Sequence, residues 1–160
     1  RIYLLVRNTH GASEMFSRYL KKYPDGAYNS EVRKLLAESL ISQKEYDLAL
    51  EHLTLITRNK NQYHLDPGVY ESIALCQAQT DDPEKACRTL RYIVNAFPNY
   101  PYLPRCYLMA GLCYEEQCQY QTAVGWYEEL ISLFPGSLEA SSAGIRLEDI
   151  RETSFLISNH

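Results

Sequence analysis

Alanines recur at a fixed spacing of 37 residues along this chain, and each begins the same apolar pattern. They are Ala12, Ala49, Ala86 and Ala123. Large apolar or aromatic residues follow each alanine four and seven positions later, as Leu53 and Ile56 follow Ala49. Residues at i, i+4 and i+7 share one face of an α-helix. The pattern therefore predicts equivalent helices that each bury one face.

A second helix is expected to precede three of these alanines. Small residues stand twelve positions upstream, each directly after an apolar residue: Leu36-Ala37, Ile73-Ala74 and Ala110-Gly111. A small residue in mid-helix lets the partner helix approach closely. The predicted repeat is helix, turn, helix, and about three such repeats must stack before they share a continuous core.

Capping residues mark where internal helices begin. Asp66 and Asp82 each stand directly before a proline, which places an N-cap acceptor ahead of a residue suited to the first turn. Asn29 or Ser30 is expected to cap the first helix of the repeat that starts there.

A terminal helix is expected after the last full repeat. Ser137 can cap it, and its apolar spacing runs from about Leu138 to Glu152. This helix has no second helix of its own, and its charged residues, Arg146 among them, are expected to form a solvated face. Residues 153–160 are expected to be a loosely packed tail.

These patterns predict one domain over residues 1–160. Its expected parts are a partial repeat at 1–25, repeats at 29–61, 66–98 and 101–135, a capping helix at 137–153 and a tail at 154–160. The chain lacks an initiator Met and begins inside a repeat, so we expect a domain cut from a longer protein or a mature form. Residues 1–8 are expected to be helical, with a strand over residues 2–6 as the alternative.

The order of aromatic and small residues resembles the tetratricopeptide repeat family. The third repeat carries the resemblance best, through Tyr107, Ala110-Gly111, Tyr114, Tyr120, Ala123, Tyr127, Leu130 and Pro135. The family repeat has about 34 residues, so the longer spacing here places extra residues in each connection. The resemblance implies an all-α fold, a right-handed superhelical solenoid of helix-turn-helix repeats.

The same resemblance implies a recognition surface for a protein or peptide partner, because the first helices of successive repeats line a concave groove in that family. The implied groove positions are Glu31, Lys34, Glu38, Ile41, Glu71, Leu75, Gln79, Arg105, Leu108, Leu112, Glu115 and Glu116. These positions are acidic at both ends and apolar in the middle, so a partner with an apolar centre and basic flanks would complement them. The chaperone-binding subset is not expected, because Glu38, Leu75 and Leu112 replace its asparagines.

Composition narrows the classes of function. The chain has 160 residues, 46% of them hydrophobic, and a net charge of -4, which leaves no room for a second catalytic domain. It carries no stripe of Lys and Arg, so we expect no nucleic-acid partner. We also expect no membrane insertion by this segment, and the sequence leaves the oligomeric state open.

The sequence offers little enzyme chemistry. It contains no phosphate-binding glycine motif, no HExxH and no GxSxG, so we expect no catalytic residue, cofactor or metal. Glu115 and Glu116 are adjacent and diverge by about 100° on a helix, which predicts solvated faces; reversing both charges is expected to weaken a groove partner. Tyr100, Tyr102 and Trp126 are expected to be exposed partner anchors.

The five cysteines are expected to be free thiols that serve as small packing residues. They are Cys76, Cys87, Cys106, Cys113 and Cys118. The one pairing that the predicted repeats leave open is Cys87 with Cys106 or with Cys113. Free thiols favour a reducing compartment.

The phrases that close the helices, such as Asn-Ala-Phe-Pro-Asn-Tyr-Pro at 95–101, resemble those of bacterial outer-membrane assembly lipoproteins and Tol-Pal coordination proteins. This resemblance implies a scaffold in a cell-envelope complex, in the periplasm or at the periplasmic face of the outer membrane. Two alternatives stay open: a cytoplasmic adaptor or chaperone-like regulator, and a helical accessory domain of a larger enzyme.

Overall fold

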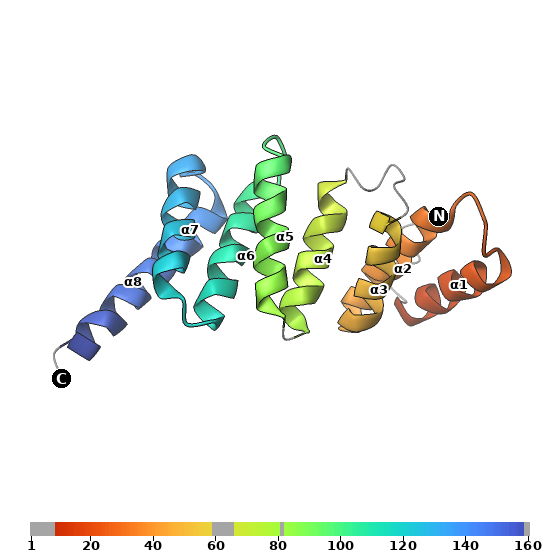
Figure 1. The fold of residues 1–160 in the computed structure, drawn as a ribbon, viewed down its shortest axis with the longest axis horizontal. Helices are drawn as coiled ribbons and strands as arrows, with labels where there is room; N and C mark the ends of the chain where they lie inside the picture. Colours follow the sequence, from red (N-terminus) through yellow and green to blue (C-terminus); the bar gives the residue numbers. More distant parts are fainter. Residues whose placement is uncertain (1–8, 59–65, 81, 159–160) are drawn as a thin grey trace. The chain divides into compact units, whose positions relative to one another are not determined.

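The computed structural model describes residues 9–58, 66–80 and 82–158, and this part of the chain is helical with short connections (Figure 1). The helices are α1 Thr9–Lys22, α2 Asn29–Ser42, α3 Tyr46–Arg58, α4 Pro67–Gln79, α5 Pro83–Ala96, α6 Leu103–Glu116, α7 Tyr120–Leu133 and α8 Leu138–Ser158. The predicted all-α class is confirmed for these residues. The predicted helix or strand over residues 1–8 lies outside them.

The chain forms two compact units, residues 1–82 and residues 83–160. The N-terminal unit holds α1 to α4, and the C-terminal unit holds α5 to α8. Within each unit, helices that follow one another in sequence pack together, and α8 also contacts α6. The boundary falls between α4 and α5, inside the predicted repeat 66–98.

The alanine ladder lies in the core, as its pattern predicts. Ala12, Ala49, Ala86 and Ala123 are buried on α1, α3, α5 and α7. The small residues of the intervening helices are buried too, and Gly111 shows why they are small. A Cβ atom at Gly111 would lie 2.1 Å from Cε1 of Tyr127 on the neighbouring α7. The ring thus occupies the space that any side chain on Gly111 would need.

The interior of the N-terminal unit is mainly aliphatic. Leu36, Leu53, Ile56, Val69 and Ile73 form its cluster, with two alanines and one cysteine among them. Such residues need no polar partner, so their shapes and volumes determine how α2, α3 and α4 fit together.

The interior of the C-terminal unit contains aromatic rings and sulfur atoms beside its aliphatic residues. Tyr107, Tyr114 and Tyr127 are buried, as are Cys87, Cys106 and Cys113. Buried tyrosines bring hydroxyl groups into the core, and these need hydrogen-bond partners.

The predicted helix starts are mostly confirmed. Asp66 accepts a hydrogen bond from the Gly68 amide at 2.9 Å, and Ser137 Oγ accepts one from the Ala140 amide at 3.0 Å. The predicted cap by Asn29 or Ser30 is wrong. The N-cap position is Tyr28, without a side-chain cap, because Asn29 Nδ2 turns back and donates to the Pro24 carbonyl at 2.6 Å.

Helix α8 continues to Ser158 instead of ending near Glu152. The sequence from 145 to 158 contains neither Gly nor Pro, so nothing in it interrupts the helical backbone. The predicted tail is therefore helical as far as Ser158, and its loose packing stays a prediction.

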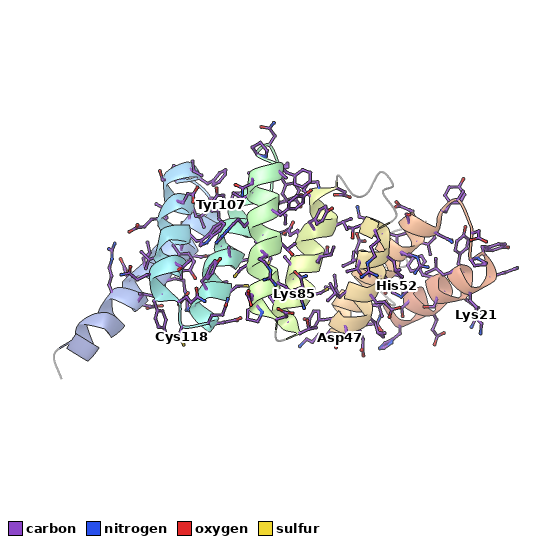
Figure 2. The ribbon with its side chains drawn as sticks, viewed as in Figure 1. Lys21, Asp47, His52, Lys85, Tyr107 and Cys118 are labelled. Atoms are coloured by element: carbon purple, nitrogen blue, oxygen red, sulfur yellow. The ribbon has the colours of Figure 1, made fainter. Side chains whose placement is uncertain are left out.

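Two turns repeat with the same backbone geometry. Lys44 and Cys118 stand two repeat lengths apart, and both have positive φ, 63° and 57°. In each turn the following amide donates to a carbonyl of the preceding helix at 2.9 Å, Glu45 to Leu40 and Gln119 to Tyr114. This left-handed residue ends one helix and directs the chain into the next. Figure 2 shows Cys118 at the turn between α6 and α7.

Candidate protein-interaction surface

Two neighbouring helices of the C-terminal unit expose apolar residues at equivalent positions. Leu112 on α6 follows Ala110-Gly111, and Ile145 on α8 follows Ala143-Gly144. Both alanines are buried. Leu112 and Ile145 lie two residues later, about 200° further around each helix, and therefore point away from the core. The exposed fractions are 36% for Leu112, 61% for Ile145 and 84% for Leu138, which lies two turns before Ile145. We call Leu108, Leu112, Leu138 and Ile145 the α6/α8 surface.

The α8 residues of this surface were not predicted from the sequence. The predictions placed recognition on the first helices of full repeats and treated α8 as a solvated cap. A signal was present in the repeated triplet Ala-Gly-Leu at 110–112 and Ala-Gly-Ile at 143–145, which gives α8 the same register as α6.

An ion pair between a half-exposed arginine and a nearly buried carboxylate joins α8 to α6. Arg146 Nε and Nη2 donate to the two carboxylate oxygens of Glu115, each at 2.9 Å, and the Tyr127 hydroxyl donates to the same carboxylate. The Glu115 side chain is only 11% exposed. The prediction of a solvated face is wrong for Glu115, because the packing of α8 on α6 brings the guanidinium to the carboxylate, whereas the Arg146 side chain stays 42% exposed.

The electrostatics of this network follow from its burial. Burial and the hydrogen bond to Glu115 both raise the pKa of Tyr127, so its hydroxyl stays a donor. The hydrogen bond to Glu115 raises the pKa of Arg146 despite partial burial. Glu115 therefore joins α6, α7 and α8, and its charge is neutralised within the unit.

The remaining predicted positions on α6 give its two ends opposite charge. Arg105, near the start of the helix, is exposed, and its guanidinium lies 4.8 Å from the centroid of the Tyr102 ring. Glu116 is exposed at the end of the helix, and Leu108 between them is partly buried. Since Arg146 neutralises Glu115, the charges beside Leu112 on α6 are Arg105 and Glu116, and the exposed Glu148 stands three residues after Ile145 on α8.

The N-terminal unit uses one of its predicted positions to join two helices. Lys34 Nζ on α2 donates to Asp66 Oδ2, which precedes α4, at 2.9 Å, and each side chain is 29% exposed. Burial lowers the pKa of Lys34, but the hydrogen bond and the charge of Asp66 outweigh it and raise that pKa. Lys34 therefore stays charged and bound to Asp66.

The other predicted positions of the N-terminal unit differ in exposure. Glu31, Glu38 and Gln79 are exposed, whereas Ile41 and Leu75 are partly buried. Glu71 is only 7% exposed. Its side chain is enclosed within the fold, and its contact with a groove partner stays a prediction.

The predicted aromatic anchors separate into two groups. Tyr102 is 55% exposed, as predicted, and it packs edge-on against the partly buried Tyr100 with ring centroids 5.5 Å apart. Trp126 is partly buried instead of exposed. Its ring lies 5.3 Å from the Tyr107 ring and 6.4 Å from the Tyr114 ring, so it belongs to the aromatic interior.

Within residues 9–58, 66–80 and 82–158, no three His, Cys, Asp or Glu side chains lie close enough together to hold a metal ion. None of the described helices combines the length and the apolar character that crossing a bilayer requires.

Comparisons with known proteins agree with this architecture. Residues 72–100 and 105–137 match the tetratricopeptide repeat family model. The sequence matches none of the curated proteins with which it was compared.

Similar solved structures include YrrB, a TPR protein with an unusual peptide-binding site, at a TM-score of 0.76 and 18% identity over 89% of this chain and 69% of YrrB. MamA is similar at a TM-score of 0.70 and 19% identity, over 96% of this chain and 92% of MamA. The apo form of RapI is similar at a TM-score of 0.71 and 20% identity, over 87% of this chain and 41% of RapI. The matched residues are therefore similar to tetratricopeptide repeats, and the described residues share the all-α fold of helix pairs with these structures.

Proposed function

We propose that this chain is a non-enzymatic protein-interaction module that binds a peptide segment with an apolar centre on the α6/α8 surface. The observation that carries the proposal is the exposure of Leu112, Leu138 and Ile145 on two neighbouring helices. Exposed apolar residues that gather on one surface are typical of interaction sites. A peptide-binding site in YrrB, whose fold is similar, adds support from a relative.

The charges at the two ends of α6 favour one orientation of the bound peptide. Glu116 at the end of α6 favours a basic residue in the partner, and Arg105 near its start favours an acidic one. This differs from the two basic flanks expected from the sequence, because that expectation included Glu31 and Glu38 of the N-terminal unit, whereas the second end of the α6/α8 surface carries Arg105. Only a few apolar anchors are present, so we expect a dissociation constant on the order of micromolar.

A peptide-display selection against the intact chain tests this proposal. We expect enriched peptides with adjacent large apolar residues, and the variant Leu112→Ser/Ile145→Ser should bind them at least about tenfold more weakly, since each lost apolar contact is worth about 1 kcal/mol or more. The matched control is Leu48→Ser, which removes a 49% exposed leucine from α3. Equal binding by both variants, or a selection without enrichment, would contradict the proposal.

The setting of this interaction is a further part of the proposal. A cell-envelope complex is supported by the phrases that connect the repeats, and a cytoplasmic adaptor or an accessory domain of an enzyme is the alternative. Determining the N-terminus of the full-length protein distinguishes them, because a signal peptide that ends in a lipidated cysteine selects the envelope.

A further inference from the structure

Two thiols meet inside the C-terminal unit. Cys87 on α5 and Cys113 on α6 are each 2% exposed, and the two helices pack against each other. Gln117 links them further, because its Nε2 lies 3.5 Å from Cys87 Sγ and donates to the Cys113 carbonyl at 2.9 Å. Of the two pairings that the sequence left open for Cys87, the structure brings together the one with Cys113.

The surroundings give the two sulfur atoms different protonation. The hydrogen bond from Cys113 lowers the pKa of Cys87 to about 7 against the opposing effect of burial, with help from Gln117, Tyr114 and the charge of Arg91. The same hydrogen bond, burial and the charge of Cys87 raise the pKa of Cys113. Cys87 is therefore the sulfur that becomes a thiolate, and Cys113 keeps its proton.

The N-terminal unit contains the same site without sulfur. Two repeat lengths earlier, Ser13, Ser39 and Gln43 stand at the positions of Cys87, Cys113 and Gln117. Gln43 Nε2 donates to Ser39 O at 3.0 Å and to Ser13 Oγ at 3.3 Å. Hydroxyl groups thus satisfy the packing and hydrogen bonding of this position, so the fold itself does not require thiols there.

We propose that Cys87 and Cys113 are an oxidisable thiol pair, a modification site that closes into a disulfide between α5 and α6 when it reacts with a small hydroperoxide. The burial of both thiols beside Gln117 and the equivalent hydroxyl site support this pair, which is independent of the proposed peptide binding. The other three cysteines differ: Cys118 is exposed at a turn, Cys76 lies in the other unit, and Cys106 lies seven residues before Cys113 on α6.

The reaction proceeds in two balanced steps. The Cys87 thiolate attacks one peroxide oxygen, the O–O bond breaks, and the products are the Cys87 sulfenic acid and, once a proton is taken up, water. The Cys113 sulfur then attacks the Cys87 sulfur, the S–O bond breaks, and the hydroxyl leaves as water with the thiol proton. Two thiols and one hydrogen peroxide give one disulfide and two waters.

The test uses the full chain with Cys118→Ser, which removes the exposed thiol. After treatment with hydrogen peroxide, we expect intact-mass spectrometry to show the loss of two hydrogen atoms, and disulfide mapping of the digest to place the link between Cys87 and Cys113. A product that gains oxygen without this link, or a link to Cys106 instead, overturns the proposal.

Two variants keep the test independent of folding defects. Cys87→Ser and Cys113→Ser each introduce the residue that the equivalent site of the N-terminal unit already contains, and circular dichroism checks their helix content. With Cys113→Ser, Cys87 should gain oxygen and form no disulfide; with Cys87→Ser, neither change should occur. Disulfide formation in the parent chain should level off above about pH 8, whereas a rate that keeps rising through about pH 9 would indicate an ordinary thiol and contradict the role of Cys87.

Discussion

The two units of this chain share one helical repeat but fill it with different chemistry. The N-terminal interior is mainly aliphatic, and its ion pair between Lys34 and Asp66 lies where the side chains are 29% exposed. The C-terminal interior holds tyrosines whose hydroxyls need partners. Tyr107 donates to Glu129 at 3.2 Å, and Arg91 donates to the Tyr114 hydroxyl at 2.7 Å.

The same spacing of small and large residues is therefore compatible with two kinds of helix packing, one determined by shape and one that also uses hydrogen bonds. Aliphatic side chains act through shape alone. Buried tyrosines add directional hydrogen bonds. A buried hydroxyl without its hydrogen-bond partner destabilises the fold more than the loss of one apolar contact does. The C-terminal unit should therefore be more sensitive to the loss of a polar partner, and the N-terminal unit less so.

The largest expected effect comes from filling the closest helix contact of the C-terminal unit. Gly111→Ala places a Cβ 2.1 Å from the buried Tyr127 ring, and we expect it to lower the free energy of unfolding by about 3 kcal/mol. The control is Gly125→Ala on α7, where a Cβ meets nothing within 4 Å. It should raise the free energy of unfolding by about 0.5 to 1 kcal/mol, as measured by urea denaturation. Similar effects of the two variants would contradict the described packing.

The second prediction concerns the ion pair between Arg146 and Glu115. Arg146→Met leaves the Glu115 carboxylate, 11% exposed, without its cation, and we expect a loss of about 2 kcal/mol in the free energy of unfolding. Arg151→Met is the matched control, because Arg151 and Glu128 form a pair at 3.8 Å with side chains 70% and 59% exposed. The control should change stability by less than about 0.5 kcal/mol, and an equal loss in both variants would contradict the distinction.

The third prediction compares the units directly. Lys34→Met removes the partner of Asp66 in the N-terminal unit, where the carboxylate left behind is 29% exposed, against 11% for Glu115. We expect a loss of about 0.5 to 1 kcal/mol, smaller than for Arg146→Met and reduced further by added salt. Urea denaturation at low and high ionic strength measures both. A larger loss than for Arg146→Met would reverse the comparison.

The sequence predicts most of the fold because the repeat is a local property. The spacing from Ala12 to Ala123 places the helices that the structure contains, and Asp66 and Ser137 mark helix starts through contacts only two or three residues away. Asn29 failed as a cap because its side chain has a competing local partner, the Pro24 carbonyl.

The candidate site was less predictable, because its geometry depends on helices distant in sequence. Arg146 reaches Glu115 only because α8 packs against α6, and no local spacing encodes that contact. Gly144-Ile145 repeats the register of Gly111-Leu112, so the exposed part of α8 could have been found by extending the small-residue pattern past the last full repeat.

The smallest expected effect is a pH dependence of the N-terminal unit. Burial and then the charge of Arg33 lower the pKa of His52 on α3 (Figure 2) below 6.5, and Arg33 Nη1 lies 3.1 Å from His52 Nδ1. The unfolded chain therefore binds this proton more readily, so stability falls as pH falls through about 6.5. We expect a change below about 1 kcal/mol between about pH 7.5 and 5.5, because water screens a half-buried group. His52→Gln should flatten urea-derived stabilities over this range, and an unchanged pH profile would contradict the prediction.

The comparison of the units also extends to their surfaces. The residue directly after the small mid-helix position is Glu38 on α2 and Leu75 on α4, but Leu112 on α6 and Ile145 on α8. Of these, Glu38 is exposed and charged and Leu75 is partly buried, whereas Leu112 and Ile145 are exposed and apolar. The C-terminal unit is thus the better candidate for an apolar partner.

The most direct test of this account is amide hydrogen exchange of the intact chain with and without a saturating peptide from the display selection. On peptide binding we expect the backbone amides of α6 and α8 to exchange more slowly and those of α2 to exchange at an unchanged rate. Protection confined to α2 and α4 would contradict it and would place recognition on the N-terminal unit.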